Sequence, residues 1–377
     1  MNLPNSPIWD DGAWPGLPEL ERDLRTEVCV IGLGGSGLAA IHELLKLGRR
    51  VVGIDARSVA GGAAGRNGGF LLAGLAKFYH ETVRQFGRGF ARGVYQATLE
   101  QIERMIQETP EAIRRVGSLR IAASEEEEQD CLEHYRALRA DGFAVECYEG
   151  PEGKGLLIPS DGVFNPLLRG RILARQALEK GAWLFEHTPA LEISGQEVRT
   201  PKARIYCQQV IVAVDGRLER LFPEMAGRVR TARLQMLGTA PAPEVRFPRP
   251  VYTRWGYDYW QQLPDGRLAL GGMRDAELEA EWTYADEPSE AIQTRLENLL
   301  RSIGVRARVT HRWAASVAYT LDGLPVAEEV RPGVWAIGGY SGTGNVVGAI
   351  CGRAVARAVS GKKPPDAALL GLFSLLE

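Results

Sequence analysis

The chain has 377 residues, an apolar fraction of 45% and a formal net charge of −2, with acidic and basic residues interspersed. This near-neutral balance, without a long basic block, argues against nucleic acid as a partner. No apolar stretch approaches the roughly 20 residues of a membrane span, and the first residues lack the basic and apolar regions of a signal peptide. We therefore expect a cytoplasmic protein with no membrane partner, divided into about two domains.

The first periodic segment predicts a strand, a glycine-rich turn, a helix and a second strand. Glu27–Ile31 and Arg50–Ile54 are apolar and β-branched, as is typical of buried parallel strands. Between them, Ser36–Leu47 carries apolar residues at helical spacing, and we expect Gly48 to end that helix. The segment is therefore predicted to be a βαβ unit.

The turn of this unit carries the pattern G-x-G-x-x-G at Gly32, Gly34 and Gly37. In such turns the first glycine permits the bend, the second lets the main chain approach a pyrophosphate, and the third lets helix and strand pack closely. The helix N-terminus then offers N–H groups to the phosphates. Asp55 follows the second strand, where an acid can bind ribose hydroxyls and disfavours a 2′-phosphate. We predict a dinucleotide site at Gly32, Gly34, Gly35, Ser36, Gly37, Asp55, Ala56 and Arg57.

Helices and short strands alternate over the middle of the chain. The acidic run Glu125–Glu128 opens a predicted helix that extends to Ala140. Acids in a first helical turn favour a solvated helix N-terminus over a metal site, and we expect no metal. In chain order, we predict an ordered loop over 61–75, a helix from Glu81 to about Arg115 that Pro110 breaks, and strands at Ser118–Ala122 and near Val145–Tyr148. A helix at Asn165–Lys180 and strands at Trp183–Thr188 and within Ala203–Ala213 follow.

The last third of the chain is first rich in strands and then repeats the strand, turn and helix order. Arg228–Met273 reads as strands, with a hairpin turn at Pro264–Gly266. A helix is expected at about Pro288–Ile303. Gly333–Gly361 then predicts a strand, a glycine-rich turn and a helix that begins near Asn345.

Several further stretches carry a resemblance to a known family. They include GGAAGRNGGF at Gly61–Phe70, FEHTPALEI, YDYWQQLPDGRLALGG, WAASVAYTLDGLP and GGYSGTGN, in this order. Together with the first motif they resemble FAD-dependent oxidoreductases of the D-amino-acid oxidase superfamily. The resemblance is closest to the branch of glycine oxidase, sarcosine oxidase and gamma-glutamylputrescine oxidoreductase, and it covers nearly the whole chain.

The resemblance implies an α/β fold in which a Rossmann-like FAD-binding domain is joined to a discontinuous α+β substrate domain with an antiparallel sheet. Residues 1–76, 155–228 and 318–377 would form the first domain, and residues 77–154 and 229–317 the second. FAD has a longer arm than NAD and needs more main-chain contacts, which two extra glycine-rich segments can supply. The further residues expected at FAD are Ala63, Ala64, Arg66, Asn67, Gly68, Gly69, Ala190, Ala213, Gly339, Tyr340, Gly342, Thr343, Gly344, Asn345 and Val346.

Two of these expectations carry alternatives. Arg66 either contacts a phosphate or the flavin edge, or forms a structural ion pair. Thr343 and Asn345 stand where the family often has a His–Gly–Val pattern, and main-chain donors survive this change. A helix N-terminus directed at the flavin would stabilise the negative charge that develops on reduction.

The implied reaction is oxidation of an amine C–N bond to an imine by hydride transfer to flavin N5. Such a reaction requires orientation and a dry pocket more than a strong general base, so we expect the five histidines to be structural. Val317 occupies the position where glycine oxidase-like relatives have an arginine that binds the substrate carboxylate, and sarcosine oxidase-like relatives a cysteine that bonds flavin. Valine does neither. We therefore expect non-covalent FAD and an amine substrate rather than an α-amino acid, unless Arg254 or Arg274 binds a carboxylate.

The substrate pocket is expected under the strand-rich region. Tyr257, Tyr259 and Gln261 alternate along one predicted strand, and aromatic side chains can enclose an aliphatic amine. The pocket candidates are Tyr257, Tyr259, Arg274 and Tyr319. Hairpin core packing for the tyrosines and a salt bridge for Arg274 are the alternatives. The alternative functions are an amino-acid oxidase of the same family, a tRNA-modifying flavoenzyme, a non-catalytic FAD-binding protein and an NAD-linked dehydrogenase.

Overall fold

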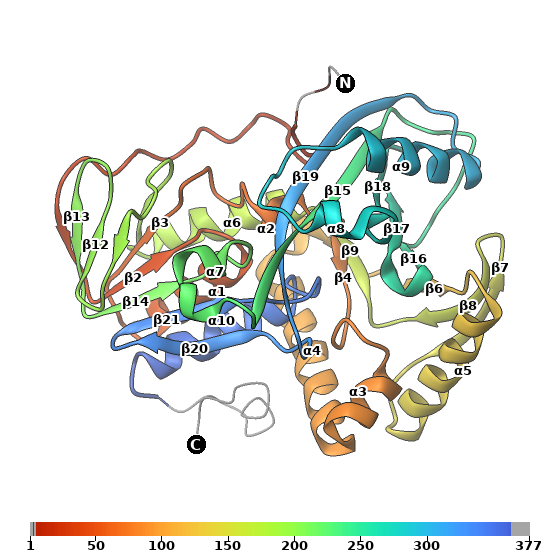
Figure 1. Cartoon of the computed structure of the whole chain (residues 1–377), viewed down its shortest axis with the longest axis horizontal. Helices are drawn as coiled ribbons and strands as arrows, with labels where there is room; N and C mark the ends of the chain where they lie inside the picture. The colour runs from red at the N-terminus through yellow and green to blue at the C-terminus, as the bar shows by residue number, and fades with distance from the viewer. Residues whose placement is uncertain (1–2, 4, 363–377) are drawn as a thin grey trace.

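The predicted βαβ unit lies in the middle of a six-stranded sheet in the computed structural model, which describes residues 3 and 5–362 (Figure 1). Strand β2 (Val28–Ile31) pairs in parallel with β3 (Val51–Ile54) and β14 (Gln209–Val212). The sheet order is β10 (Trp183–Phe185), β3, β2, β14, β21 (Val334–Gly338) and β20 (Val326–Arg331). Only the pairing of β20 with β21 is antiparallel. A glycine-rich turn between β2 and α1 (Gly35–Lys46) therefore faces the carboxyl edge of a parallel sheet, where ligands bind in such folds.

Two helices from opposite ends of the chain pack together beside this sheet. Helix α10 (Val347–Ala358) contacts α1, and a Cβ at Gly352 would lie 2.1 Å from the carbonyl oxygen of Ser36. Helix α6 (Pro166–Glu179) also contacts α1, and α7 (Leu218–Leu221) follows β14. A separate four-stranded sheet contains β1 (Leu24–Arg25), β13 (Arg204–Tyr206), β12 (Glu197–Arg199) and β11 (Glu192–Ile193).

An eight-stranded sheet forms the other half of the molecule (Figure 1). Its order is β19 (Val309–Thr320), β15 (Val229–Thr239), β18 (Leu268–Gly272), β17 (Asp258–Gln262), β16 (Val251–Thr253), β6 (Ser118–Ile121), β8 (Gly153–Ile158) and β7 (Glu146–Gly150). All pairs are antiparallel except β16 with β6. The predicted hairpin turn joins β17 to β18, with Gly266 at φ 86°. Helix α9 (Glu290–Ser302) buries Ile292, Leu296 and Leu300 in the core beneath this sheet.

The structure corrects three predictions of local structure. The single helix expected from Glu81 is two helices, α3 (Tyr79–Phe86) and α4 (Arg88–Glu108), because Gly87 has φ 87° and turns the chain between them. The expected 61–75 loop contains α2 (Ala63–Arg66) and β4 (Phe70–Leu71), which forms a small sheet with β9 (Gly162–Phe164) and β5 (Ile113–Arg114). The strand expected within Ala203–Ala213 is divided between β13 and β14, which belong to different sheets.

The acidic run at the start of α5 (Glu125–Ala140) differs in part from its prediction. Ser124 caps the helix through the N–H of Glu127. Glu127 is not solvated but buried, and its carboxylate accepts hydrogen bonds from the N–H groups of Ala123, Arg254 and Trp255. This carboxylate therefore holds α5 against a turn that borders the cavity described below.

The predicted domain boundaries coincide only partly with the sheets. The boundary at 155 falls inside β8 and the boundary at 318 falls near the end of β19, and both strands belong to the eight-stranded sheet. The division into two domains stays a prediction, and its last 15 residues, 363–377, lie outside the described residues. No helix within the described chain combines the length and apolar character that crossing a bilayer requires.

Candidate active site

A cavity of about 1040 Å³ lies between the six-stranded and eight-stranded sheets. This volume is at the upper end of the roughly 300–1,000 Å³ of typical ligand sites. Its glycine-rich wall consists of Gly32, Gly34–Ser36, Ala63, Ala64, Arg66–Gly68 and Tyr340–Val346. Its aromatic wall consists of Phe70, Tyr252, Tyr259 and Tyr319, with Arg120 and Arg274. Segments that are far apart in the sequence thus line one cavity.

Almost all predicted site residues line this cavity. The exceptions are Gly37, Gly69 and Gly339. Each exception supports the wall from behind: a Cβ would lie 1.8 Å from Gly32 O at Gly37, 2.3 Å from Phe164 O at Gly69 and 2.7 Å from Thr320 Cγ2 at Gly339. The predicted residues that line it are Gly32, Gly34, Gly35, Ser36, Asp55, Ala56, Arg57, Ala63, Ala64, Arg66, Asn67, Gly68, Ala190, Ala213, Tyr340, Gly342, Thr343, Gly344, Asn345, Val346, Tyr257, Tyr259, Arg274 and Tyr319.

The turn before α1 leaves main-chain donors available to the cavity. Gly32 has φ 105°, and a Cβ there would lie 2.5 Å from Ala213 O, so only glycine permits this path. Gly34 is the N-cap of α1 and supplies no side-chain acceptor for the first N–H groups of the helix. Those N–H groups and the positive end of the helix dipole fit a pyrophosphate.

The carboxylate of Asp55 is bound by the main chain of two neighbouring turns. It accepts hydrogen bonds from Leu33 N at 2.7 Å and from Arg57 N at 2.8 Å. Burial raises the pKa of Asp55 to about 6, although these hydrogen bonds act in the opposite direction. Asp55 therefore fixes the turn that follows β2, and its predicted contact with a ribose stays a prediction.

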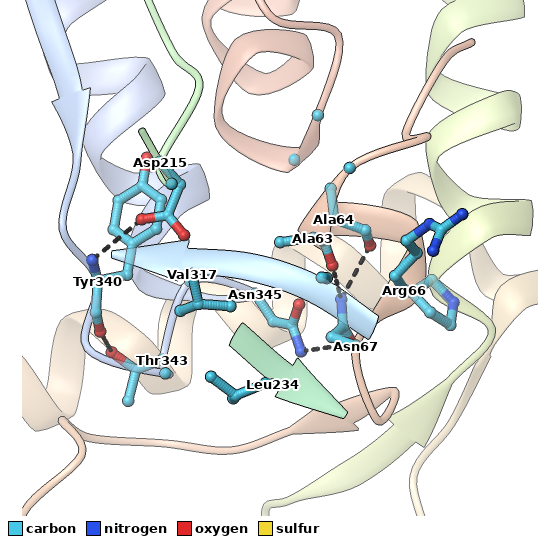
Figure 2. Close-up of a pocket in the computed structure, with 18 of the residues that line it drawn as sticks. Ala63, Ala64, Arg66, Asn67, Asp215, Leu234, Val317, Tyr340, Thr343 and Asn345 are labelled. Carbon is cyan, nitrogen blue, oxygen red and sulfur yellow. Dashed lines mark hydrogen bonds between the residues drawn. The ribbon is translucent and has the colours of Figure 1, made fainter. Parts of the chain in front are cut away.

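Asn67 connects the second glycine-rich segment to the third. Its side-chain amide donates to Ala64 O at 2.8 Å, and its side-chain oxygen accepts from Gly69 N at 2.8 Å and from Asn345 Nδ2 at 3.2 Å. Asn345 also donates to Phe70 O. Figure 2 shows the side chains of Asn67 and Asn345 pointing toward each other. Both side chains thus position main chain along the cavity.

The two arginines predicted at the cofactor bind other parts of the protein. Arg66 donates to the side-chain oxygen of Asn5 at 2.9 Å and to Ala314 O at 2.9 Å, so it forms hydrogen bonds instead of the alternative ion pair. Arg57 forms an ion pair with Asp286, which also pairs with Arg217 at 3.2 Å. Arg217 and Asp286 line the cavity and were not predicted. The loop before α9 is thus fastened to the six-stranded half of the molecule.

The third glycine-rich segment is held by a half-buried acid. Asp215 accepts hydrogen bonds from Tyr340 N at 3.3 Å and Ala318 N at 3.4 Å. Burial raises the pKa of Asp215 to about 7, and these main-chain donors lower it. The hydroxyl of Thr343 donates to Tyr340 O at 2.8 Å (Figure 2). Helix α10 then begins at Val347, two residues after the predicted start, and no side chain caps its N-terminus.

Val317 and Leu234 form an apolar patch between these segments. They project from the adjacent strands β19 and β15, between the Ala63–Asn67 segment and the Tyr340–Asn345 segment (Figure 2). None of the five cysteines and none of the five histidines, all of which the structure describes, lines the cavity. The cavity therefore offers no thiol for a covalent flavin bond.

The tyrosines of the aromatic wall form a row across the large sheet. Tyr252 pairs with Tyr259 and also with Arg120, on the neighbouring strands β17 and β6. The rings of Tyr252 and Tyr259 stack with centroids 6.0 Å apart, and Phe70 contacts both rings. Tyr257 precedes β17 instead of lying in it and is 38% exposed. Tyr252 was not predicted; the one local signal for it is the short β-prone stretch Val251–Thr253.

Gln261 and Arg254, the remaining candidates, have structural partners. Gln261 is buried and donates to Gly68 O at 2.6 Å, and it does not line the cavity. Arg254 forms ion pairs with Asp258 and Asp275, so its charge is neutralised outside the cavity.

Arg274 has no acid partner. Its guanidinium lies 4.7 Å from the ring centroids of both Trp282 and Tyr319. It forms no ion pair or hydrogen bond within residues 3 and 5–362, and its Nη1 is buried without a partner. The salt bridge considered as an alternative for Arg274 is therefore not formed.

A comparison with protein families identifies the family of this chain. Residues 27–358 match the family described as FAD dependent oxidoreductase, DAO. The chain belongs to this family. The resemblance drawn from the sequence and the α/β fold class with a Rossmann-like FAD-binding domain are therefore confirmed, and the protein is an FAD-dependent oxidoreductase.

Individual relatives agree with this assignment. The chain is 28% identical to the probable oxidoreductase OrdL of Rhizobium meliloti, with 92% of this chain and 86% of OrdL covered. It is 25% identical to gamma-glutamylputrescine oxidoreductase of Escherichia coli, over 91% and 85% of the two chains. Among solved structures, glycine oxidase from Geobacillus kaustophilus has a TM-score of 0.76 at 21% identity, over 94% of this chain and all of that chain.

Proposed function

We propose that this protein oxidises the C–N bond of a small-molecule amine to an imine, with non-covalently bound FAD. When bound, FAD supplies the two-electron acceptor for such a reaction. The observation that carries the proposal is the cavity in which a glycine-rich wall, with the uncapped N-terminus of α1, faces an aromatic wall. The similarity to a gamma-glutamylputrescine oxidoreductase supports an amine as substrate.

The glycine-rich wall has hydrogen-bond donors that fit the acceptor groups of FAD. The uncapped N-terminus of α1 suits the pyrophosphate, and Ala63–Gly68 and Tyr340–Val346 bring main chain to the remainder of the cavity. We propose that the predicted residues lining this wall hold the cofactor, with Asp55, Asn67 and Asp215 fixing the three turns. The absence of cysteine from the cavity lining in the described chain supports non-covalent binding.

The aromatic wall is proposed to orient the amine. Tyr252, Tyr259 and Tyr319 present ring faces and hydroxyl groups, and aromatic faces attract cationic amines. The pKa of Tyr319 is raised to about 12 by burial, so its hydroxyl keeps its proton at neutral pH. These residues exclude water and hold the carbon next to nitrogen in place.

The cytoplasmic location expected from the sequence stays a prediction.

The purified protein tests this proposal directly. It should show the visible spectrum of a flavin, which would leave the solution on denaturation without remaining attached to the chain. Under anaerobic conditions, one amine among polyamine derivatives, N-methyl amines and amino acids should bleach that spectrum. A flavin that no amine reduces would contradict the proposal and would indicate a non-catalytic FAD-binding protein.

A second candidate function, oxidation of an amino acid, is favoured by one observation. Arg274 is an unpaired guanidinium on the aromatic wall, and it can bind a carboxylate that Val317 cannot. If amino acids are the substrates, Arg274→Met should raise KM for an amino acid and leave KM for the corresponding amino-acid amide nearly unchanged. Equal effects on both compounds would exclude Arg274 as a carboxylate-binding residue.

A further inference from the structure

The segment before the first strand runs from the eight-stranded half of the molecule to the six-stranded half (Figure 1). It precedes the region that matches the family, which begins at residue 27. Within the described chain this segment contains no helix or strand before β1, yet Ile8 and Trp9 are only 2% and 5% exposed. Chain ends are poorly ordered unless contacts hold them, so residues 5–11, here called the strap, require an explanation for their burial.

The beginning of the strap is attached to the eight-stranded half. The side-chain oxygen of Asn5 accepts a hydrogen bond from Ala314 N in β19 at 3.3 Å, and its amide nitrogen donates to Asp286 O at 2.9 Å. Ile8 packs against β15, where a Cβ placed on Gly238 would lie 2.7 Å from Cδ1 of Ile8. The absence of a side chain at Gly238 thus leaves the space that Ile8 fills.

The strap also binds the second glycine-rich segment. Trp9 donates from Nε1 to Asn67 O at 3.0 Å. Arg66 donates from Nη1 to the side-chain oxygen of Asn5 at 2.9 Å and from Nη2 to Asn5 O at 2.8 Å. Arg66 and Asn67 both line the cavity, and the side chain of Asn67 contacts Asn345 of the third glycine-rich segment. The strap therefore holds the main chain where these two segments meet.

The end of the strap is attached to the six-stranded half. Arg171 of helix α6 pairs with Asp10 at 2.9 Å and with Asp11 at 3.3 Å, and its side chain is largely buried. The cavity lies between the two sheets, so the strap connects the halves that form its two walls. A cofactor held between these walls is released more slowly while this connection persists.

We propose that the strap retains FAD in the cavity. It keeps the second glycine-rich segment in its cofactor-binding form, and the cofactor leaves after the strap detaches. Asn5 and Trp9 are positioning residues, because they act through Arg66 and Asn67. The inference requires FAD dependence, which the family establishes, and no particular substrate. Linkage makes the effect reciprocal, so bound FAD should hold the strap in place by the same factor by which the strap strengthens FAD binding.

Release of FAD from the holoenzyme, followed by the rise in flavin fluorescence after dilution, tests the first half of this inference. Trp9→Phe keeps an aromatic ring and removes the N–H donor to Asn67, and it should speed release about 3- to 10-fold. Asn5→Ala removes the acceptor for Arg66 and should speed release about 10- to 100-fold. Gly238→Ala displaces Ile8 from outside the cavity and should also speed release.

Trp183→Phe is the matched control for Trp9→Phe. Trp183 lies in β10 and is 52% exposed, so the same chemical change should leave the release rate unaltered. If the urea unfolding midpoint falls in Trp9→Phe and Asn5→Ala while FAD release keeps its wild-type rate, the strap contacts serve stability alone and the inference is wrong.

Hydrogen exchange tests the reciprocal half. Main-chain amides of residues 5–11 should exchange more slowly in the FAD-loaded chain than in the FAD-stripped chain, and Trp9→Phe should reduce this difference. Equal exchange in both forms would overturn the inference, because a strap that retains FAD must itself be stabilised by FAD. Neither measurement involves oxidation of an amine. A protein that oxidises no amine would therefore contradict the proposed function and leave the result for the strap intact.

Discussion

On the glycine-rich wall the polar side chains bond to the protein's own main chain, whereas on the aromatic wall two guanidinium groups do not. Asp55, Asn67 and Asp215 each bind two or more main-chain groups. Within the described chain, the guanidinium groups of Arg120 and Arg274 lie against aromatic rings and form no hydrogen bond or ion pair. The first arrangement fixes a backbone shape for a constant cofactor, and the second leaves charge available for a substrate. Variants on the two walls should therefore affect different observables.

The largest effect is expected for Gly37→Ala. The added Cβ would lie 1.8 Å from Gly32 O, a main-chain atom that cannot move without opening the turn. We expect a loss of about 3 kcal/mol in stability and a low FAD content, measured as the ratio of absorbance at 450 nm to protein concentration.

Gly89→Ala is the matched control for Gly37→Ala. Gly89 lies in helix α4, and nothing is within 4 Å of a Cβ placed there. This variant should keep wild-type FAD content and stability, because alanine favours a helix. Full FAD content in Gly37→Ala would show that the glycine-rich wall tolerates distortion, contrary to the contrast drawn between the two walls.

Asp161→Asn tests whether Arg120 is free of an acid partner. Burial raises the pKa of Asp161 to about 6 in the folded protein, against roughly 3.9 in an unfolded chain. The folded state then binds more protons, so this contribution to stability is present at low pH and is lost as the pH rises through about 6. The stability lost over the whole pH range is up to about 3 kcal/mol, and about half of this loss should occur between pH 5 and 7.5.

The asparagine variant should show a flatter pH dependence of the urea unfolding midpoint over that interval. Its amide oxygen can accept from Ala73 N and its amide nitrogen can donate to Ser118, so both contacts survive. A wild-type midpoint that instead falls as the pH decreases, with a flat variant, would mean that Asp161 is ionised and paired with Arg120. The guanidinium of Arg120 would then not be available to a ligand.

Gly271→Ala should affect substrate binding without affecting FAD. The added Cβ would lie 2.6 Å from Cε2 of Tyr259 and 2.7 Å from Cγ of Met236, which are side-chain and not main-chain atoms. Displacing the Tyr259 ring should cost about 1–2 kcal/mol, which corresponds to a rise of about 5- to 30-fold in KM for the oxidised amine. FAD content should stay at the wild-type level, and a variant that loses FAD together with substrate affinity would show that the two walls are mechanically coupled.

The same contrast explains which parts of the site can be predicted from sequence. Gly32, Gly34 and Gly37 act through local backbone geometry, so their spacing is sufficient to identify the turn. Arg120 and Tyr252 meet only because β6 and β16 pair in parallel across a long sequence separation, and no local pattern encodes that pairing. The only local signal for Arg120 is a single charged residue within the predicted strand Ser118–Ala122.

The hydrogen-bond and ion-pair partners of the arginines are likewise not encoded in the local sequence. The sequence marks Arg57 and Arg66 as cations near a glycine-rich turn, but their partners Asp286 and Asn5 come from a loop before α9 and from the N-terminal segment. Elements with strong periodicity, such as α1 and α5, were predicted well. The break at Gly87 was not, because a glycine inside a helical pattern is compatible with both a continuous and an interrupted helix.

The smallest effect is expected for Asp286→Asn. This variant tests whether Arg57 and Arg217 fasten the loop before α9 to the six-stranded half of the molecule or bind the cofactor. Asp286 pairs with Arg57 and Arg217, and the side chains of these arginines are 40% and 36% exposed. Ion pairs at this exposure contribute little, about 0.2–1 kcal/mol. The variant should release FAD about 2- to 5-fold faster, followed by the rise in flavin fluorescence after dilution. High salt should bring the wild-type rate toward that of the variant, because screening weakens the same pairs. Slower release from Asp286→Asn would mean that Asp286 competes with the cofactor phosphates for Arg57, and Arg57 would then belong to the cofactor site itself.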